Sequence, residues 1–548
     1  MSERVEPTIG RASAVLASGT IVSRILGFVS AAVLASAIGI IGAGADTFAL
    51  ANQLPNNVYA LVAGGLLSAV IVPQIVRAGM HDDGGARFVN KLVTLGLVVF
   101  LAVTVIATLC APLLVALYSD AGPQSGFSER DVALATSFAY WCLPQVFFYA
   151  VYSLAGEVLN ARGVFGPFTW TPAANNVIAI GGLLIFIALF GPDPAHRDSA
   201  TWTTPQVAVL AGSATLGIAV QAFLLFLFWT RAGLRFRPDF RWRGVGLRGA
   251  GESAAWVFGM FLVTQVSGVV ESRVALSASG EASLGVLKYA WLMFIVPHSV
   301  VTVSIVTAYF TRMSTHARDN RLPAVRADLE AALRSVLLIL IFSAIGLSVL
   351  AYPFSAVFAS TFSDVQALAS VYLAYLAGLV PFTIFFVLLR VYYAIDDTRT
   401  PFFIQIAQTT LFVGGALLIG ALVESRWIAV ALALLLSIAV TFQAVLAAWF
   451  LRRKLGPLGT IAVARSALWF TAAALPAAAA GLGLLAALGW VNEESFAVSS
   501  RWAALATLAI VGLVMAAVYA VGLAITRNPE FLALARPVLS RMRRAGRA

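Results

Sequence analysis

Long apolar stretches follow one another along almost the whole chain, and they restrict its fold more than any other feature. The hydrocarbon core of a bilayer is about 30 Å thick, and a helix needs about 20 apolar residues to cross it. By that measure we expect about fourteen transmembrane helices, near residues 12–41, 47–76, 91–118, 132–158, 167–191, 205–230, 251–276, 283–311, 330–352, 368–395, 401–423, 428–450, 463–489 and 502–526. The sequence therefore predicts an all-α polytopic membrane protein.

The composition agrees with a lipid-facing surface. Hydrophobic residues make up 60% of the chain and charged residues 11%, whereas a soluble domain has about 25% charged residues. The net charge is +11, but the basic residues lie in short gaps between apolar stretches, as they do in cytoplasmic loops. We therefore expect no nucleic-acid partner.

The sequence offers little for catalysis or metal binding. Its two cysteines, Cys110 and Cys142, lie inside apolar stretches, and its four histidines are scattered without ligand spacing. The predicted outer loops are short and carry no cluster of acids. We expect no catalytic residue, no metal site and no cofactor, and hence a protein that is not an enzyme.

Basic residues alternate between the gaps. The two tails and the even-numbered gaps, with the adjoining helix ends, hold 28 of the 36 Lys and Arg residues, and the odd-numbered gaps hold four. Because cytoplasmic loops carry the excess of Lys and Arg, this split predicts a multi-pass protein of the inner membrane with both termini cytoplasmic.

A weak internal repeat indicates the domain organisation. The segment LNARGVFGPF (159–168) resembles AIDDTRTPFF (394–403), and Pro55 and Pro297 are separated by a similar offset. We expect two pseudo-symmetric six-helix lobes at 1–230 and 251–450. Two further helices at 463–526 and a basic cytoplasmic tail at 527–548 complete the chain.

Ionisable residues within the predicted spans are the candidate functional residues, because each costs about 2.5–3.5 kcal/mol on insertion scales. Arg24 lies deep in the first span and is expected to face a cavity. Asp46 begins the second span, where it is either a helix N-cap or a gating residue. Glu271 and Arg273 approach the outer end of the seventh span and either pair with neighbours or take part in gating and binding. Lys288 lies early in the eighth span.

These charges favour an anionic substrate. If Arg24, Arg273 and Lys288 face one another, they form a cationic pocket that suits a diphosphate, which arginine binds through paired charge-assisted hydrogen bonds. Asp46 and Glu271 remain as candidates for gating or coupling. A cation exporter would instead require unpaired carboxylates in the cavity.

Several motifs resemble the MurJ/MviN family of the multidrug/oligosaccharidyl-lipid/polysaccharide exporter superfamily, particularly its actinobacterial members. They are SRILGF (23–28), GADTFALANQLPN (44–56), GGLLSAVIVPQIVR (64–77), TPAANNVIAI (171–180), VPHSVVTVSIVTAYFTRMS (296–314) and YYAIDDTRTPF (392–402). The resemblance implies two lobes around a central cavity and a flippase for lipid II, the undecaprenyl-diphosphate-linked peptidoglycan precursor. It implies alternating access driven by an ion gradient or the membrane potential, with lipid II, the bilayer and cell-wall synthesis proteins as partners.

The family's charged residues carry over in part. Arg24 matches a cavity arginine of the family, and Asp46 matches the acid at the start of the second span. Other family arginines are replaced, at Ser30, Tyr59, Ala60 and Leu292. Lys288 lies one helical turn before Leu292, so we expect it to substitute for the missing charge.

Other functions are compatible with the sequence. An exporter of another polyprenyl-diphosphate-linked glycan and a drug or cation antiporter of the same superfamily share the resemblance, although fourteen spans argue against the drug branch. A polytopic cell-wall glycosyltransferase would need acids at the membrane surface, and a structural scaffold has no use for Arg24 inside the bilayer.

Overall fold

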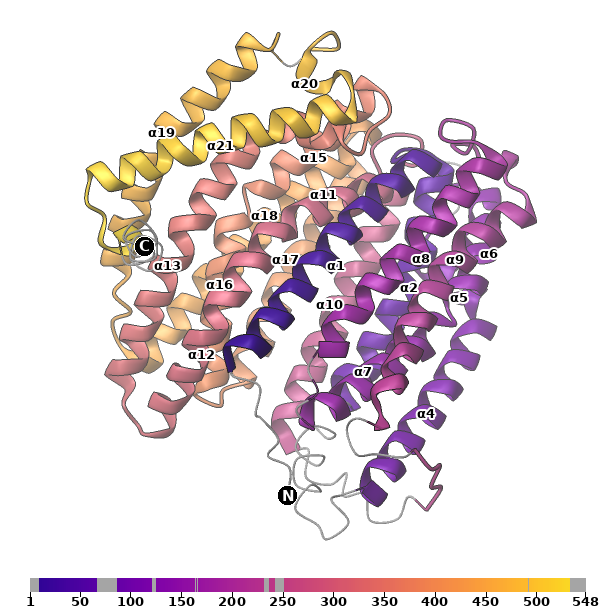
Figure 1. Ribbon diagram of the computed structural model, residues 1–548, viewed down its shortest axis with the longest axis horizontal. Helices are drawn as coiled ribbons and strands as arrows, with labels where there is room; N and C mark the ends of the chain where they lie inside the picture. Colours follow the sequence, from indigo (N-terminus) through magenta and orange to yellow (C-terminus); the bar gives the residue numbers. More distant parts are fainter. Residues whose placement is uncertain are drawn as a thin grey trace, which may run out of the picture. The chain divides into compact units, whose positions relative to one another are not determined.

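The computed structural model describes residues 9–66, 86–120, 125–162, 164, 166–230, 236–241, 251–490 and 492–532, and these residues are mainly helical (Figure 1). A single isolated bridge, between Ser279 and Glu281, is the β pairing found in these ranges. The prediction of an all-α fold is confirmed. The chain divides into two compact units, Met1–Gly285 and Val286–Ala548.

The first unit contains nine α-helices among its described residues. They are α1 (Ile9–Ile38), α2 (Ala43–Leu66), α4 (Ala86–Leu109), α5 (Ala111–Tyr118), α6 (Glu129–Cys142), α7 (Gln145–Ala161), α8 (Gly166–Phe190), α9 (Thr204–Leu224) and α10 (Gly251–Leu276). The short 3₁₀ turns η2 (Ser199–Thr201) and η3 (Leu225–Phe228) flank α9.

The second unit begins at Val286, within α11 (Leu284–Pro297). Its further helices are α12 (Val303–Arg318), α13 (Leu322–Val349), α14 (Ala351–Ala356), α15 (Phe362–Leu376), α16 (Leu379–Ala394), α17 (Arg399–Leu422), α18 (Ser425–Leu455), α19 (Thr460–Ala487), α20 (Phe496–Ser499) and α21 (Arg501–Ile525). A π-helical turn, η6 (His298–Thr302), joins α11 to α12. The predicted lobe boundaries and the internal repeat stay predictions.

Twelve stretches of the described chain are long and apolar enough to cross a membrane, and a thirteenth arises if α15 and α16, bent by 43°, form one span. The second predicted span corresponds to α2, which is not among these stretches because Asp46 and four amide side chains interrupt it. Its predicted continuation to residue 76 lies outside the described residues. The count of fourteen therefore stays a prediction.

Three of the predicted spans are broken next to a proline. The span expected at 91–118 changes from α4 to α5 at Cys110, where Pro112 opens the new helix. The span at 132–158 breaks before Gln145, at Pro144, and η6 follows Pro297 in the span at 283–311. Proline causes such breaks because it lacks an N–H and its ring clashes with the preceding turn.

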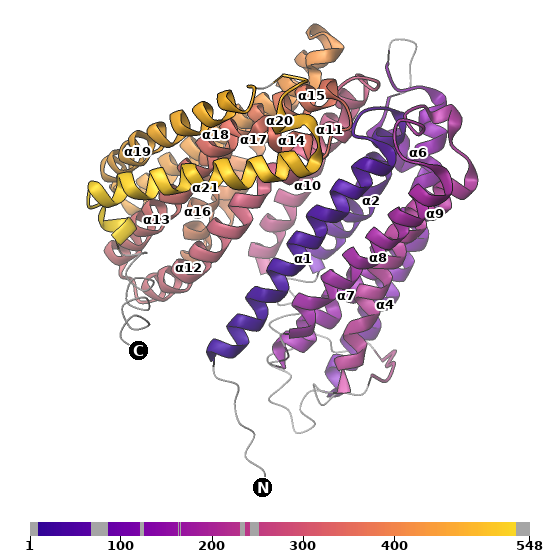
Figure 2. The same ribbon diagram turned by 45° about the horizontal axis from the view of Figure 1, so that its top comes forward.

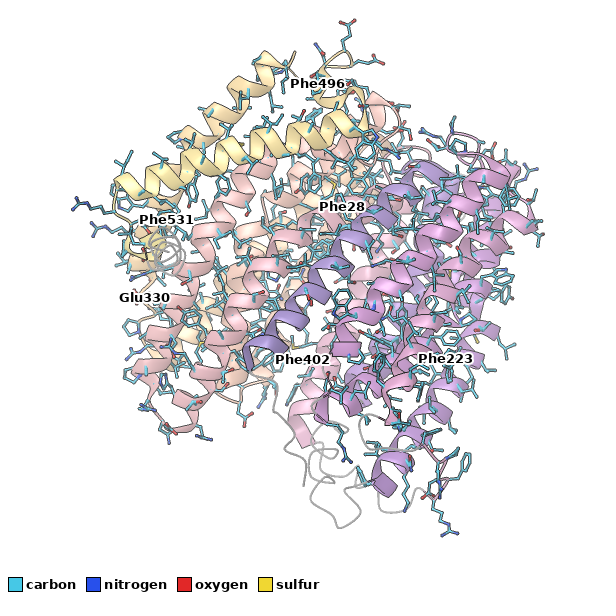
Figure 3. The ribbon with its side chains drawn as sticks, viewed as in Figure 1. Phe28, Phe223, Glu330, Phe402, Phe496 and Phe531 are labelled. Carbon is cyan, nitrogen blue, oxygen red and sulfur yellow. The ribbon has the colours of Figure 1, made fainter. Side chains whose placement is uncertain are left out.

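Close helix packing within the first unit depends on glycine. Helix α8 packs along α1 on one side and α9 on the other (Figures 1 and 2). A Cβ atom on Gly182 of α8 would overlap Ser213 of α9, whereas one on the neighbouring Gly181 would meet open space. Lipid-facing side chains lie elsewhere: Phe223 of α9, labelled in Figure 3, is 53% exposed.

In the second unit, α19 packs along α13 and against α21 (Figure 1). Phe470, Met515 and their neighbours form an apolar core there. Arg334 of α13 pairs with Glu330 and with Glu530, 3.6 Å away, which ties the segment after α21 to α13. Glu330 and Phe531 are labelled in one region of Figure 3.

An ion pair fixes the turn between α16 and α17. Burial alone would raise the pKa of Asp397, but the Lys454 ammonium and hydrogen bonds from Thr400 outweigh burial and lower this pKa below its usual value. The Thr400 N–H donates to Asp397 Oδ1 at 3.0 Å, and Lys454 also donates to the Thr400 hydroxyl at 3.0 Å. The turn is therefore anchored to the end of α18.

Candidate functional site

Helix α2 carries polar side chains that form hydrogen bonds with several other segments of the first unit. In addition to Asp46 in its first turn, it carries Asn52, Gln53, Asn56 and Asn57. Polar groups in a membrane protein are costly unless they find partners or face a cavity. The contacts of these side chains therefore show which segments α2 holds in place.

Asp46 is the most enclosed of the predicted site residues, with 1% of its surface exposed. Its Oδ2 accepts a hydrogen bond from the Ser279 hydroxyl at 2.7 Å, and its Oδ1 accepts one from the Gly285 N–H at 2.9 Å. Gly285 is the second residue of α11, so Asp46 caps that helix and not its own. The positive end of a helix dipole favours a carboxylate at this position.

The segment that Asp46 holds, residues 277–285, also pairs with the loop before α6. The Gly126 N–H donates to the Ser277 carbonyl at 2.9 Å. A Cβ on Gly126 would lie 2.7 Å from the Ser279 carbonyl, so glycine permits this close approach. Asp46 and Gly126 therefore both contact segment 277–285.

Further hydrogen bonds join α2 to α10 and α5. Gln53 Nε2 donates to the Ser272 hydroxyl at 3.1 Å, and Gln265 Nε2 donates to the Asn57 carbonyl at 2.9 Å. Asn57 Nδ2 donates to the Tyr118 hydroxyl at 3.1 Å. These hydrogen bonds between neutral groups hold α10 along α2. The charged residues of α10, Glu271 and Arg273, make other contacts.

Arg273 has an acidic neighbour. Its guanidinium lies 3.3 Å from Asp120 and donates to the Leu117 carbonyl at 3.4 Å. Leu117 lies near the end of α5, and Asp120 follows this helix. Arg273 therefore pairs with neighbours in this structure, which is one of the two alternatives that the sequence offers. Glu271 is half-buried on the same turn of α10 and also has an interaction partner.

Arg24 lies on an exposed face of α1, between the exposed Ile21 and Ile25. The preceding residue, Ser23, accepts a hydrogen bond from Asn176 of α8 at 2.8 Å. Successive helical residues are about 100° apart, so Arg24 projects to one side of the α8 contact. Lys288 belongs to the second unit and is exposed between buried residues of α11. The predicted convergence of Arg24, Arg273 and Lys288 stays a prediction.

The sequence interpretation missed the neutral partners of the site. It considered ionisable residues within spans and passed over Ser279, Gly285 and the amides of α2. The cluster ANQLPNN (51–57), with four amides inside an apolar stretch, was the available signal. Within the described ranges, no three His, Cys, Asp or Glu residues are grouped to hold a metal ion, and Cys110 and Cys142 are free thiols.

Membrane-length helices joined by hydrogen bonds define a polytopic membrane protein, and comparisons with known proteins identify its family. The sequence model described as "Lipid II flippase MurJ" matches residues 34–507. The chain therefore belongs to the lipid II flippase MurJ family. It is a transporter rather than an enzyme, and a multi-pass protein of the bacterial inner membrane.

Individual relatives agree with this assignment. A probable lipid II flippase MurJ of Haemophilus influenzae is 28% identical over 404 residues, covering 70% of this chain and 75% of the relative. That of Vibrio cholerae is 29% identical over 406 residues, covering 71% and 73%.

Solved structures share the fold. A lipid II flippase MurJ in an inward closed conformation matches with a TM-score of 0.70 at 18% identity, covering 94% of this chain and 99% of that one. An inward-facing multidrug MATE transporter of the MOP superfamily matches with a TM-score of 0.61 at 17% identity, covering 80% and 96%. At these identities the likeness concerns the fold alone.

Proposed function

We propose that this chain moves lipid II from the inner to the outer leaflet of the membrane by alternating access. The observation that carries the proposal is the family match over residues 34–507, which spans both structural units. The membrane-length helices give it a physical basis, because a flippase must shield a polar headgroup inside the bilayer.

We further propose that Asp46 is a gating residue. Alternating access requires contacts that close one end of the protein and then break. The bonds from Ser279 and Gly285 to Asp46 suit this role, since they connect α2 to a segment more than 230 residues away.

For the diphosphate of the substrate, we propose Arg24 and Lys288 as cationic contacts. Arg24 supplies a planar fork of donors that matches phosphate oxygens, and Lys288 supplies a compact charge. Arg273 would join them by exchanging Asp120, which is 68% exposed in its side chain, for a phosphate oxygen. Glu271, on the same turn, remains the second candidate for gating or coupling.

We propose the remaining assignments from charge distribution and family resemblance. Both termini are cytoplasmic, and proteins of cell-wall synthesis are partners. Reporter fusions at the two ends test the orientation: a cytoplasmic reporter should be active at both, and activity at one end alone would contradict an even number of spans.

The function is tested by depletion of the native flippase in a bacterial host and complementation with this chain. The wild-type chain should restore growth and prevent lipid II from accumulating in the inner leaflet. Lys288→Ala should lose this activity, whereas Lys91→Ala, a matched change on α4, should keep it. Accumulation of lipid II despite a folded, membrane-inserted chain would refute the function and favour export of another polyprenyl-linked glycan or a drug.

A further inference from the structure

A partly open cavity of about 220 Å³ lies within the first unit, lined by α1, α2, α7, α8 and α9. Figures 1 and 2 show α1, α8 and α9 running side by side in this unit. The polar part of the cavity wall comprises Ser30, Asn52, Tyr149, Asn175, Asn176 and Ser213. The other lining residues are apolar, so the unit contains a chamber whose wall is about half polar.

The wall has unused hydrogen-bonding capacity. In the part of the chain that the structure describes, the Asn175 amide and the hydroxyls of Ser30 and Tyr149 make no hydrogen bond. Asn52, exposed at the rim, accepts one long bond through Oδ1 and donates none. The other three side chains are half-buried, so their free donors and acceptors are available to a ligand that carries matching groups.

Its polar groups are held in position by the helices behind them. Gln145 is fully buried, donates to Thr215 at 2.9 Å and to Asn52 Oδ1 at 3.4 Å, and leaves its own Oε1 without a partner. Gly217 of α9 permits the close approach of Asn175, because an added Cβ would overlap its amide oxygen. The polar wall is thus built into the packing of α7, α8 and α9.

The chemistry of the wall selects a neutral ligand. Its lining residues contain amides and hydroxyls but no Asp, Glu, Lys or Arg, so a desolvated ion would find no opposite charge there. The volume lies below the roughly 300–1,000 Å³ of pockets for drug-sized ligands. A single ring bearing hydroxyl and amide groups fits both the size and the hydrogen-bonding pattern.

We propose that this chamber binds one sugar ring of the lipid-linked headgroup, through the Asn175 amide and the Ser30 and Tyr149 hydroxyls. The inference rests on the proposed function, and it assigns the neutral part of the headgroup to a place separate from the cationic contacts for the diphosphate. The saccharide would supply the partners that these side chains lack.

Binding to the purified full chain in nanodiscs tests this assignment with three probes: lipid II, the same lipid without its peptide, and undecaprenyl diphosphate. Asn175→Ala should weaken binding of both sugar-bearing lipids at least tenfold and leave that of undecaprenyl diphosphate unchanged. Ser30→Ala, from a different helix, should act in the same direction. Asn90→Ala makes the same chemical change on α4, outside the chamber, and should bind all three probes as the wild type does.

Each other outcome overturns the assignment. Equal loss for all three probes means that Asn175 supports packing, and unchanged binding in both variants means that the chamber holds water. An effect confined to the peptide-bearing lipid identifies a peptide site instead. A wild-type chain that does not bind lipid II refutes the proposed function itself, whereas normal wild-type affinity with unaffected variants refutes the chamber assignment alone. Undecaprenyl diphosphate binding reports the folding of each variant.

Discussion

Ser279→Ala removes the hydrogen bond from the Ser279 hydroxyl to Asp46, one of the contacts that hold segment 277–285 to this carboxylate. The alanine leaves the Asp46 Oδ2 atom buried without its donor, while the bond from the Gly285 N–H remains. The substitution therefore weakens the closed end of the first unit without removing the charge itself. It separates the contribution of this contact from the larger effects of replacing Asp46.

The size of the effect follows from the charge of the acceptor. A hydrogen bond to an ionised group contributes about 1.5–3 kcal/mol, and about 1.4 kcal/mol corresponds to a tenfold change in an equilibrium constant. If segment 277–285 separates from Asp46 when the end opens, Ser279→Ala should raise the open population about tenfold to a hundredfold.

Cysteine labelling measures the open population. Ala282 lies within the segment and is 5% exposed, so Ala282→Cys in a Cys110→Ala background should react with a maleimide mainly in the open state. The buried Cys142 serves as an internal reporter of global unfolding. Adding Ser279→Ala should raise the labelling rate at position 282 by the predicted factor and leave Cys142 unlabelled.

Ser277→Ala is the matched control. Its hydroxyl donates to the Val274 carbonyl at 2.7 Å, a local bond that persists when the segment leaves Asp46. The increase in labelling rate should be at least three to five times smaller for Ser277→Ala than for Ser279→Ala. The reason is that a neutral and a charge-assisted hydrogen bond differ by about 1 kcal/mol. Equal rates in the two variants would refute the gating argument for Asp46.

Three further outcomes are expected. Gly182→Ala should lower the free energy of unfolding by about 1–3 kcal/mol through overpacking against α9, whereas Gly181→Ala should change it by less than about 1 kcal/mol; equal melting temperatures would contradict this packing. Because the folded-state pKa of Asp397 is lowered, its pair with Lys454 stabilises the fold above the unfolded-state pKa of about 4 and loses this contribution as the pH falls through the lower folded value. The melting temperature of Lys454→Met should therefore fall less on acidification than that of the wild type. If the two melting temperatures fell in parallel with pH, the pair would be excluded as the source of the acid sensitivity. Arg24→Lys should retain part of the complementing activity and Arg24→Ala should lose it, and full activity of the alanine variant would remove Arg24 from the site.

The helices were largely predictable from sequence because the signal for a span is local. The expected spans at 167–191 and 502–526 agree with α8 and α21 to within one residue at each end. Hydropathy is less informative where a proline interrupts an apolar run: the stretch at 91–118 reads as one span but is two helices. It also underestimates α2, in which Gln53 and Asn57 donate hydrogen bonds to neighbouring helices.

The site was predictable to a smaller extent. The high cost of a charge inside a span drew attention to Asp46 and Arg273, and both have specific partners in the structure. Their partners could not be found in this way: Ser279 and Gly285 are small, common residues, far from Asp46 in sequence. The polar chamber is still less visible, because Ser30, Asn175 and Tyr149 come from three helices and carry no charge.

The sequence by itself determined that the chain crosses a membrane many times, because span length and the positions of Lys and Arg depend on the lipid and the water around each segment. Its motifs also indicated the family to which the chain belongs. The tertiary structure alone decided that the carboxylate of Asp46 caps α11 and not α2, and that five helices line a neutral chamber. Hydrogen-bond partners and cavities depend on which helix faces pack together, and an apolar segment can present any of its faces to lipid or to protein.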